Sequence, residues 1–339
     1  MQCISSVTYS FLVNDSAHGR VVPTRGIRQG DPLSPYIFIL CGEVLSCLCK
    51  RAQRSGHLAG LGVSTSAPRL NHLLFADDTM FFLNTDEESC STLMDILQKY
   101  RMSSGQLINA SKSSISFSAK TLQVIRQRVK LYLGIEKERG TGKYLGLPEH
   151  FGRRKKDLFT IIVDRIRVNA ASWSSRHPSS AGKLVMLKSV LSAVPSHAMT
   201  CFLLPISLCI RIQSTLTRFW WDSSPEKKKM CMVAWSKLTK PKVLGGLGIR
   251  DIQAFNTALL AKQAWRIITK PDCLLAWVLK GKYCGSAQFL QVQETKTMSH
   301  GWRGILAVKT KQKKKEQWRS TEGRRDTGSG SGDMMVIVR

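Results

Sequence analysis

The stretch LNHLLFADDTMFFL, residues 70–83, decides the fold of the N-terminal part of this chain. Two apolar runs rich in strand-forming residues flank Ala76, Asp77 and Asp78. Because neighbouring side chains of a continuous strand point to opposite faces, two adjacent carboxylates converge only where the strand turns. The pattern therefore predicts a β-hairpin with both carboxylates at its tip.

Two interpretations of the Asp77-Asp78 pair are open. An Asp-Asp pair between two strands is ordinary turn chemistry. Alternatively, apolar core residues on both sides hold the two carboxylates rigidly at the surface, where they form a hard-oxygen site for Mg²⁺. The apolar residues expected to do so are Leu73, Leu74, Phe75, Met80, Phe81 and Phe82.

The segment before this stretch predicts a second hairpin and a helix. Residues 5–13 are rich in strand formers, and an Asn14-Asp15-Ser16 turn and a short run at Val21-Val22 follow them. The next segment, TRGIRQGDPLSP, is a loop dense in Gly and Pro. Residues 35–54 then carry apolar side chains at helical spacing, with Pro35 suited to the first turn.

The chain is basic, and its charge is uneven. It has 339 residues, a net charge of +28 and 43% hydrophobic residues, which excludes a single small module and global disorder. Residues 1–120 hold 11 basic and 9 acidic residues, whereas residues 121–339 hold 40 basic and 14 acidic residues and all eight tryptophans. Such an excess of positive charge favours a polyanionic partner, most often nucleic acid.

The ten cysteines are scattered, and no Cys-x2-Cys pair indicates a zinc site. Because no signal peptide is apparent near Met1, we expect free thiols in an intracellular protein, nuclear or cytoplasmic. No apolar run approaches the roughly 18 residues of a membrane span, so no membrane partner is expected.

Four motifs together resemble a known enzyme family. RQGDPLSP at 28–35, FADD at 75–78, SGQLINASKS at 104–113 and KYLGLP at 143–148 are similar, in order and spacing, to the later palm motifs of reverse transcriptases. The chain resembles in particular the reverse transcriptase of plant non-LTR (LINE-type) retrotransposons. Downstream segments resemble the extended region of these elements, namely LVMLKSVLSAVP, FWWDS, GGLGIRDIQAFNTALLAKQAWRI and GKYC.

The resemblance implies roles for individual residues. Asp77 would be a ligand of Mg²⁺ and Asp78 would complete the acidic hairpin, in a two-metal transfer of a nucleotide from a dNTP to a DNA primer on an RNA template. Gln29 and Gly30 would lie against the template base and the incoming nucleotide, where only glycine permits close approach. Lys112 would lie near the triphosphate.

Two of these motifs have an equally good structural interpretation. Asp31 precedes Pro32 and can cap the free N–H groups at a helix start. Lys112 can be a solvated lysine before a strand formed by SSISFS, residues 113–118. Both alternatives stay open at the level of the sequence.

The chain departs from the family at its start. The family uses a third carboxylate, on an earlier strand, to bridge both metals, and we expect that strand and the fingers to be missing from an N-terminally truncated chain. Asp15, in a turn, and Asp86, at a helix start with Glu87 and Glu88, are poor substitutes because neither lies on a strand beside FADD. We therefore expect little or no polymerase activity from this chain alone.

Residues 151–308 predict a mostly helical, thumb-like region. Leu184, Leu187, Leu191 and Val194 form one apolar stripe and Ile252, Phe255, Leu259 and Ile267 another; both are expected to be core. Basic residues on the opposite faces, with RRKK at 153–156 and KKK at 227–229, could follow a nucleic-acid backbone. The tail, residues 309–339, is basic and then Gly/Ser-rich, and predicts disorder.

The expected fold class is α+β, with a partial right-hand polymerase palm over residues 1–150 and the helical region after it. Three hypotheses remain. The chain is a reverse transcriptase remnant without activity on its own, a nucleic-acid-binding remnant without chemistry, or an open reading frame without a stable product.

Overall fold

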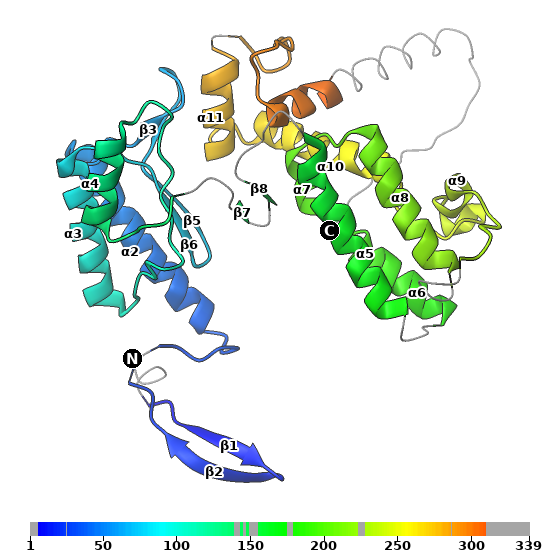
Figure 1. The fold of residues 1–339 in the computed structure, drawn as a ribbon, viewed down its shortest axis with the longest axis horizontal. Helices are drawn as coiled ribbons and strands as arrows, with labels where there is room; N and C mark the ends of the chain where they lie inside the picture. The colour runs from blue at the N-terminus through cyan, green and yellow to red at the C-terminus, as the bar shows by residue number, and fades with distance from the viewer. Residues whose placement is uncertain are drawn as a thin grey trace. The chain divides into compact units, whose positions relative to one another are not determined.

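The structure is a computed structural model, and it forms two compact units, residues 1–142 and 143–339. It describes residues 6–24, 26–138, 143–144, 147–148, 155–174, 179–222, 228–285 and 287–309. The predicted α+β class is confirmed, because antiparallel strands and helices come first and a mostly helical region follows (Figure 1). The predicted disordered tail after Lys309, most of the RRKK run and Lys227 lie outside the described residues.

The strands of the first unit form separate antiparallel hairpins. They are β1 (Tyr9–Val13) with β2 (Ser16–Val21), β3 (Leu61–Gly62) with β4 (Arg69–Leu70), and β5 (His72–Phe75) with β6 (Asp78–Phe81). The predicted turn after β1 is confirmed. Asn14 and Asp15 both have positive φ, 49° and 60°, as a two-residue type I′ turn requires.

The described part of this unit also contains three helices, which are α2 (Ser34–Arg54), α3 (Glu87–Ser104) and α4 (Gln123–Leu133). The prediction of a proline in the first turn of α2 is confirmed. Asp86 caps α3, since its side chain accepts a hydrogen bond of 2.7 Å from the backbone N–H of Ser89. A small core between α2 and α3 consists of Leu45, Cys49, Leu58 and Ile96.

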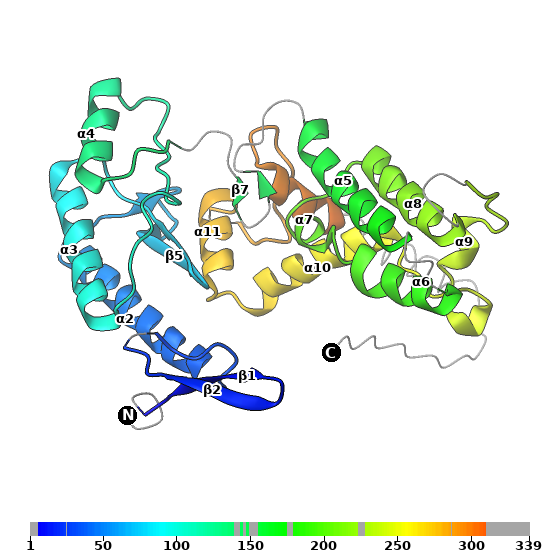
Figure 2. The ribbon, with the colours of Figure 1, turned by 60° about the horizontal axis from the view of Figure 1, so that its bottom comes forward.

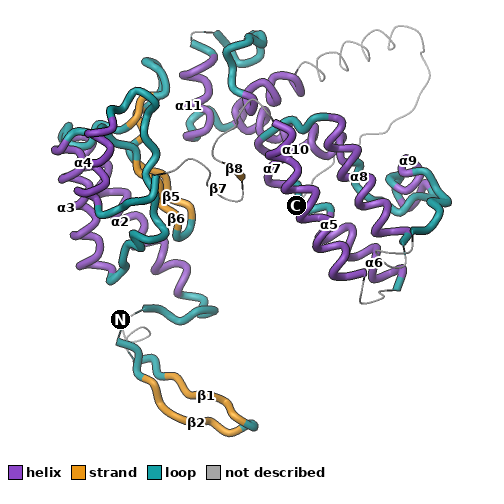
Figure 3. Tube along the Cα trace, in the orientation of Figure 1, coloured by secondary structure: helices purple, strands orange, loops and turns teal. Residues whose placement is uncertain are grey.

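The second unit is helical apart from the short pair β7 (Lys143–Tyr144) and β8 (Leu147–Pro148), which belongs to the KYLGLP motif (Figure 3). Helices α5 and α8 lie side by side in both views (Figures 1 and 2). The helices are α5 (Lys155–Ser174), α6 (Ser180–Met186), a π-helical turn at Leu187–Leu191, α7 (Ser196–Cys201), α8 (Ile206–Trp221), α9 (Trp235–Leu238), a 3₁₀ turn at Lys242–Leu244, α10 (Ile252–Thr269) and α11 (Leu274–Tyr283), and residues 300–309 are also helical.

Both predicted apolar stripes are confirmed as core. Leu187, Leu191, Ile252 and Ile267 are fully buried, and the other members of the stripes pack against them. The buried residues form two clusters. One joins α5, α7, α8 and the start of α10, and the other joins the end of α10, α11 and the helix at 300–309 around Trp302.

Asn256 is a buried polar residue that the sequence did not reveal. Its side chain is 1% exposed and projects from α10 toward the end of α7. The amide donates hydrogen bonds of 2.8 and 2.9 Å to the carbonyls of Met199 and Phe202, and its oxygen accepts one of 2.8 Å from the backbone N–H of Leu204. Asn256 therefore forms hydrogen bonds with three backbone groups at and just after the end of α7.

The GGLG segment before α10 contains a glycine that close packing requires. A Cβ on Gly246 would lie 2.0 Å from the carbonyl oxygen of Lys240. The two segments approach closely because the backbone N–H groups of Gly246, Leu247 and Gly248 donate to carbonyls within 238–241. The loop that carries Lys237, Lys240 and Lys242 is thereby held in a fixed conformation.

Within the described ranges, no helix is both long enough and apolar enough to cross a bilayer. Each of the nine described cysteines is a free thiol. Burial raises the pKa of Cys49 to about 11, which keeps this thiol protonated at neutral pH.

Candidate active site

The predicted acidic hairpin is present. Strands β5 and β6 pair in register from His72 with Phe81 to Phe75 with Asp78, so Ala76 and Asp77 form the two-residue turn. Ala76 has a φ of 49°, a conformation that costs a residue with a Cβ roughly 1–2 kcal/mol. Both aspartates are exposed, and among the described residues neither carboxylate has a hydrogen bond or ion pair.

Side-chain contacts fix the hairpin along α2. As the residue number rises in the hairpin, the number of its partner on α2 falls. Asn71 donates to the carbonyl of Cys49 (2.7 Å), His72 contacts the hydroxyl of Ser46 (2.9 Å), and Leu74 lies beside Gly42. The hairpin residues nearer the tip therefore contact α2 residues nearer the start of that helix. The acidic turn is therefore on the side of the helix N-terminal half (Figure 1).

His72 is held in one tautomer. The oxygen of the Asn71 side chain only accepts hydrogen bonds, so His72 Nδ1 donates to it (2.6 Å) and Nε2 accepts from Ser46. Burial lowers the pKa of His72, Lys50 lowers it further, and Glu43 raises it. The lowered pKa favours the neutral form of this half-buried ring, in which Nε2 can accept the hydrogen bond from Ser46.

The expectation of core residues along the whole hairpin is wrong for its tip. Leu74 and Phe75 are 39% and 57% exposed, whereas Phe81 packs against the small core of the unit. The base of the hairpin reaches that core and the tip extends past it. On α2, an apolar stripe is also exposed at helical spacing, and it consists of Tyr36, Ile39, Leu40 and Val44.

The RQGD segment lies at the start of α2. The Asp31 carboxylate accepts a hydrogen bond of 2.7 Å from the backbone N–H of Leu33, the residue that precedes the helix. This contact supports the helix-entry interpretation of Asp31. Gly30 has a φ of 86° with open space around its Cα, so its backbone conformation requires glycine. Gln29 is exposed.

Lys112 lies in a turn that Asn109 closes, because the Asn109 side chain accepts from the backbone N–H of Lys112 (3.1 Å). Its side chain is exposed. The predicted SSISFS strand is wrong: one isolated parallel bridge pairs Ile115 with Glu138. Among the described residues, no hydrogen bond or ion pair joins Gln29, Lys112 or Asp31 to the acidic turn.

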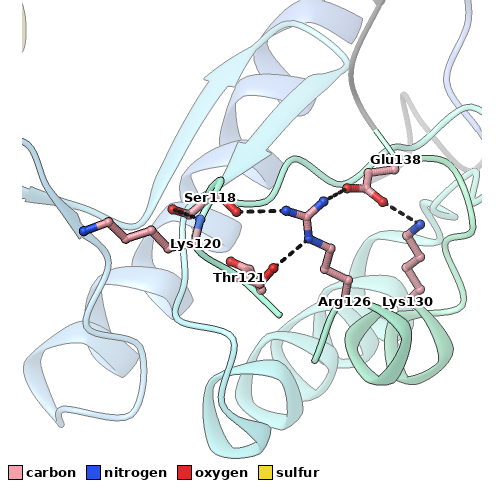
Figure 4. A network of polar contacts seen from close by, with 6 residues as sticks. All are labelled: Ser118, Lys120, Thr121, Arg126, Lys130 and Glu138. Carbon is pink, nitrogen blue, oxygen red and sulfur yellow. Dashed lines mark hydrogen bonds and ion pairs between the residues drawn. The ribbon is translucent and has the colours of Figure 1, made fainter. Parts of the chain in front are cut away.

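An ion-pair network fixes the segment after Lys112 (Figure 4). Arg126 on α4 donates to Glu138 (2.7 Å) and to the carbonyls of Ser118 and Thr121, and Lys130 donates to the other Glu138 oxygen (2.8 Å). The hydrogen bond from Lys130 and the charges of both cations lower the pKa of Glu138. The sequence analysis did not predict this network, because the shared carboxylate lies 12 residues from Arg126 and 8 from Lys130.

The acidic turn suits one Mg²⁺ ion by its donor chemistry. Mg²⁺ is commonly bound through one or two carboxylates, with water and substrate phosphates as the other ligands, and Asp77 and Asp78 are adjacent, exposed and not engaged by a described cation. Over the described ranges, no group of three or more His, Cys, Asp or Glu side chains is placed to hold a metal. The turn thus supplies two carboxylates.

The chain is similar to a protein family model and to several known proteins. A family model described as "Reverse transcriptase (RNA-dependent DNA polymerase)" matches residues 1–148. The chain is 40% identical over 131 residues to the putative ribonuclease H protein At1g65750 of Arabidopsis thaliana, of which it spans 21%. It is 44% identical over 115 residues to the uncharacterized mitochondrial protein AtMg00310 of the same plant, of which it spans 75%.

A third relative is an insect retroelement protein. The chain is 33% identical over 96 residues to the retrovirus-related Pol polyprotein from type-1 retrotransposable element R2 of Popillia japonica, and it covers 12% of that polyprotein. The chain therefore spans only a small part of the long relatives that it matches. The three matches cover 39%, 34% and 28% of this chain.

Proposed function

We propose a nucleotidyl-transfer function for this chain, which belongs to the family of the Arabidopsis protein AtMg00310 and whose residues 1–148 form a reverse transcriptase (RNA-dependent DNA polymerase) domain. The observation that supports it most directly is the pair of exposed carboxylates at the β5–β6 turn, inside the matched region. The similarity to an R2 polyprotein and the plant relatives favour an origin in a plant non-LTR retrotransposon.

In this proposal Asp77 and Asp78 would hold Mg²⁺, which would supply Lewis-acid chemistry for the primer 3′ hydroxyl and the pyrophosphate leaving group. Gln29 and Gly30, at the entry to α2, position the template base and the incoming nucleotide. Lys112 neutralises charge on the triphosphate. The substrates are a dNTP, a DNA primer and an RNA template.

A complete two-metal site needs a further carboxylate, and we propose that a polypeptide segment outside these 339 residues supplies it. Two carboxylates alone would leave the charge of two Mg²⁺ ions poorly screened. The exposed apolar residues of α2 and of the hairpin tip suit the docking of such a segment, because Leu74 and Phe75 directly precede the turn and Leu74 lies beside Gly42 of α2.

Primer extension tests this proposal. With a primed RNA template, dNTPs and Mg²⁺, the 339-residue chain alone is expected to extend no more primer than its own Asp77→Asn, Asp78→Asn double variant. Fusion to the fingers and first palm strand of a related reverse transcriptase is expected to restore extension. Extension by the unfused chain at the rate of an intact enzyme would contradict the requirement for a further carboxylate.

Nucleic-acid binding without chemistry is a second candidate function, and the charge of the second unit favours it. Residues 228–270 contain nine basic residues and one acidic residue, Asp251, whose carboxylate caps α10. All nine are exposed, and in the described part of the chain none forms an ion pair. They are Lys228, Lys229, Lys237, Lys240, Lys242, Arg250, Lys262, Arg266 and Lys270.

Salt dependence measures this binding. If the chain neutralises four or more phosphates of a single strand, its affinity is expected to fall about 50-fold between 50 and 200 mM KCl, because bound cations displace condensed counterions. Asp77→Asn is expected to leave the Kd within about twofold, since the charged surface lies in the other unit. Salt-independent binding would exclude a phosphate-contacting surface.

A further inference from the structure

Two tryptophans of the second unit are exposed, whereas the other four with described side chains are buried or half-buried. Six of the eight tryptophans have described side chains. Trp302 and Trp235 are buried, and Trp220 and Trp221 are half-buried. Trp265 and Trp277, in contrast, are 66% and 50% exposed.

Both exposed tryptophans lie on one helical hairpin. Trp265 is on α10 and Trp277 is on α11, and only residues 270–273 separate the two helices (Figure 2). On α10, Trp265 belongs to an exposed face that also carries Lys262, Arg266 and Thr269. The opposite face of α10 is buried against the cores through Asn256, Leu260, Ala264 and Ile267. The indole of Trp265 is therefore on the side of α10 away from its packed face.

The charged residues of the segment that carries these indoles are mostly basic. Residues 252–284 contain five basic residues, Lys262, Arg266, Lys270, Lys280 and Lys282, and a single acidic one, Asp272. The stacked rings and cation–π contacts among the described residues involve other aromatic side chains, such as Tyr283 and Phe289. Between described residues, no ring stacking or cation–π contact involves Trp265 or Trp277, and both indoles are exposed.

We propose that the α10–α11 hairpin binds single-stranded nucleic acid, with bases stacked on Trp265 and Trp277 and phosphates contacted by the neighbouring lysines and Arg266. The proposal rests on the nucleic-acid binding argued above and specifies its site. Exposed aromatic rings interleaved with cations match a single strand, whose bases are free to stack. A duplex offers its phosphates but keeps its bases stacked on one another.

The purified full-length chain tests this with fluorescent 20-nucleotide oligo-U and oligo-dT and a 20-base-pair duplex. The double variant Trp265→Ala, Trp277→Ala is expected to bind both single strands about 10- to 100-fold more weakly. Its affinity for the duplex should stay within about threefold. Quenching of tryptophan fluorescence by oligo-dT should also decrease, while far-UV circular dichroism stays unchanged because the replaced rings are exposed.

Two further variants separate stacking from other causes. Trp265→Tyr, Trp277→Tyr keeps aromatic faces and is expected to bind within about threefold of the wild type. Trp265→Leu, Trp277→Leu keeps apolar area without an aromatic face and should bind as weakly as the alanine variant. Val243→Ala, which truncates a side chain that is 91% exposed elsewhere in the unit, is the matched control and should have no effect.

These experiments can separate failure of the stacking site from failure of nucleic-acid binding as a whole. Salt-sensitive binding that the alanine variant retains in full would overturn the stacking site and leave general nucleic-acid binding intact. Binding by the leucine variant that is as tight as that of the wild-type chain would also overturn the stacking site. Absence of any binding by the wild-type chain would instead overturn the nucleic-acid function itself.

Discussion

Asp77→Asn is expected to slow primer extension by at least about 1,000-fold in the chain fused to a segment that supplies the third carboxylate. The substitution keeps the size of the side chain and suits the turn, so the hairpin should persist. It removes the negative charge from a metal ligand, and a catalytic metal contributes several kcal/mol of transition-state stabilisation. Single-turnover extension of a primed RNA template measures the loss.

The matched controls for Asp77 are two other carboxylates of the first unit, Asp15 and Asp86. Asp15→Asn places a favoured residue in the type I′ turn, and Asp86→Asn keeps a good N-cap for α3. Both variants are expected to retain extension within about twofold. If either control slowed primer extension as much as Asp77→Asn, the acidic turn would not be the metal-binding site of the reaction.

Asn256→Ala is expected to destabilise the second unit by about 3–5 kcal/mol. The truncation removes the buried hydrogen bonds of Asn256 to the carbonyl of Met199 and from the N–H of Leu204, and each loss costs about 1–3 kcal/mol; the part-buried bond to the carbonyl of Phe202 is lost as well. Urea unfolding followed by tryptophan fluorescence measures the change, because Trp235 and Trp302 lie in the two cores.

Gln253→Ala is the control on the same helix. Gln253 is exposed, one turn before Asn256, and its truncation should change the free energy of unfolding by less than about 0.5 kcal/mol. Equal stability of the two variants would show that water replaces the Asn256 side chain at no cost. That result would remove the role assigned to this residue.

Much of the fold could be predicted because local patterns determine it. The Asn14-Asp15 turn, the start of α3 after Asp86 and the buried stripe of α10 each depend on neighbouring residues alone. The contacts of Asn256 could not be predicted, since they join residues more than 50 positions apart. Periodicity shows that position 256 faces inward but not what it meets there.

The sequence predicted which residues form the candidate site. It did not predict the backbone conformation of the turn or the exposure of the residues beside it. The adjacent carboxylates and their strands predicted the hairpin, and the structure places Asp77 in its turn. The positive φ of Ala76 had no signal in the sequence, because alanine does not favour that conformation. The exposure of Leu74 and Phe75 was also hidden, since an apolar residue does not reveal whether a partner covers it.

Helix α10 has a consequence for how the second unit unfolds, because one rigid element is shared by two hydrophobic clusters. Its first turns complete the cluster around Leu191 and Leu216, and its last turns complete the cluster around Trp302. Loss of either cluster exposes half of the helix and removes support from the other half. The two clusters therefore behave as one cooperative folding unit, and the exposed indole of Trp265 stands on the segment that couples them.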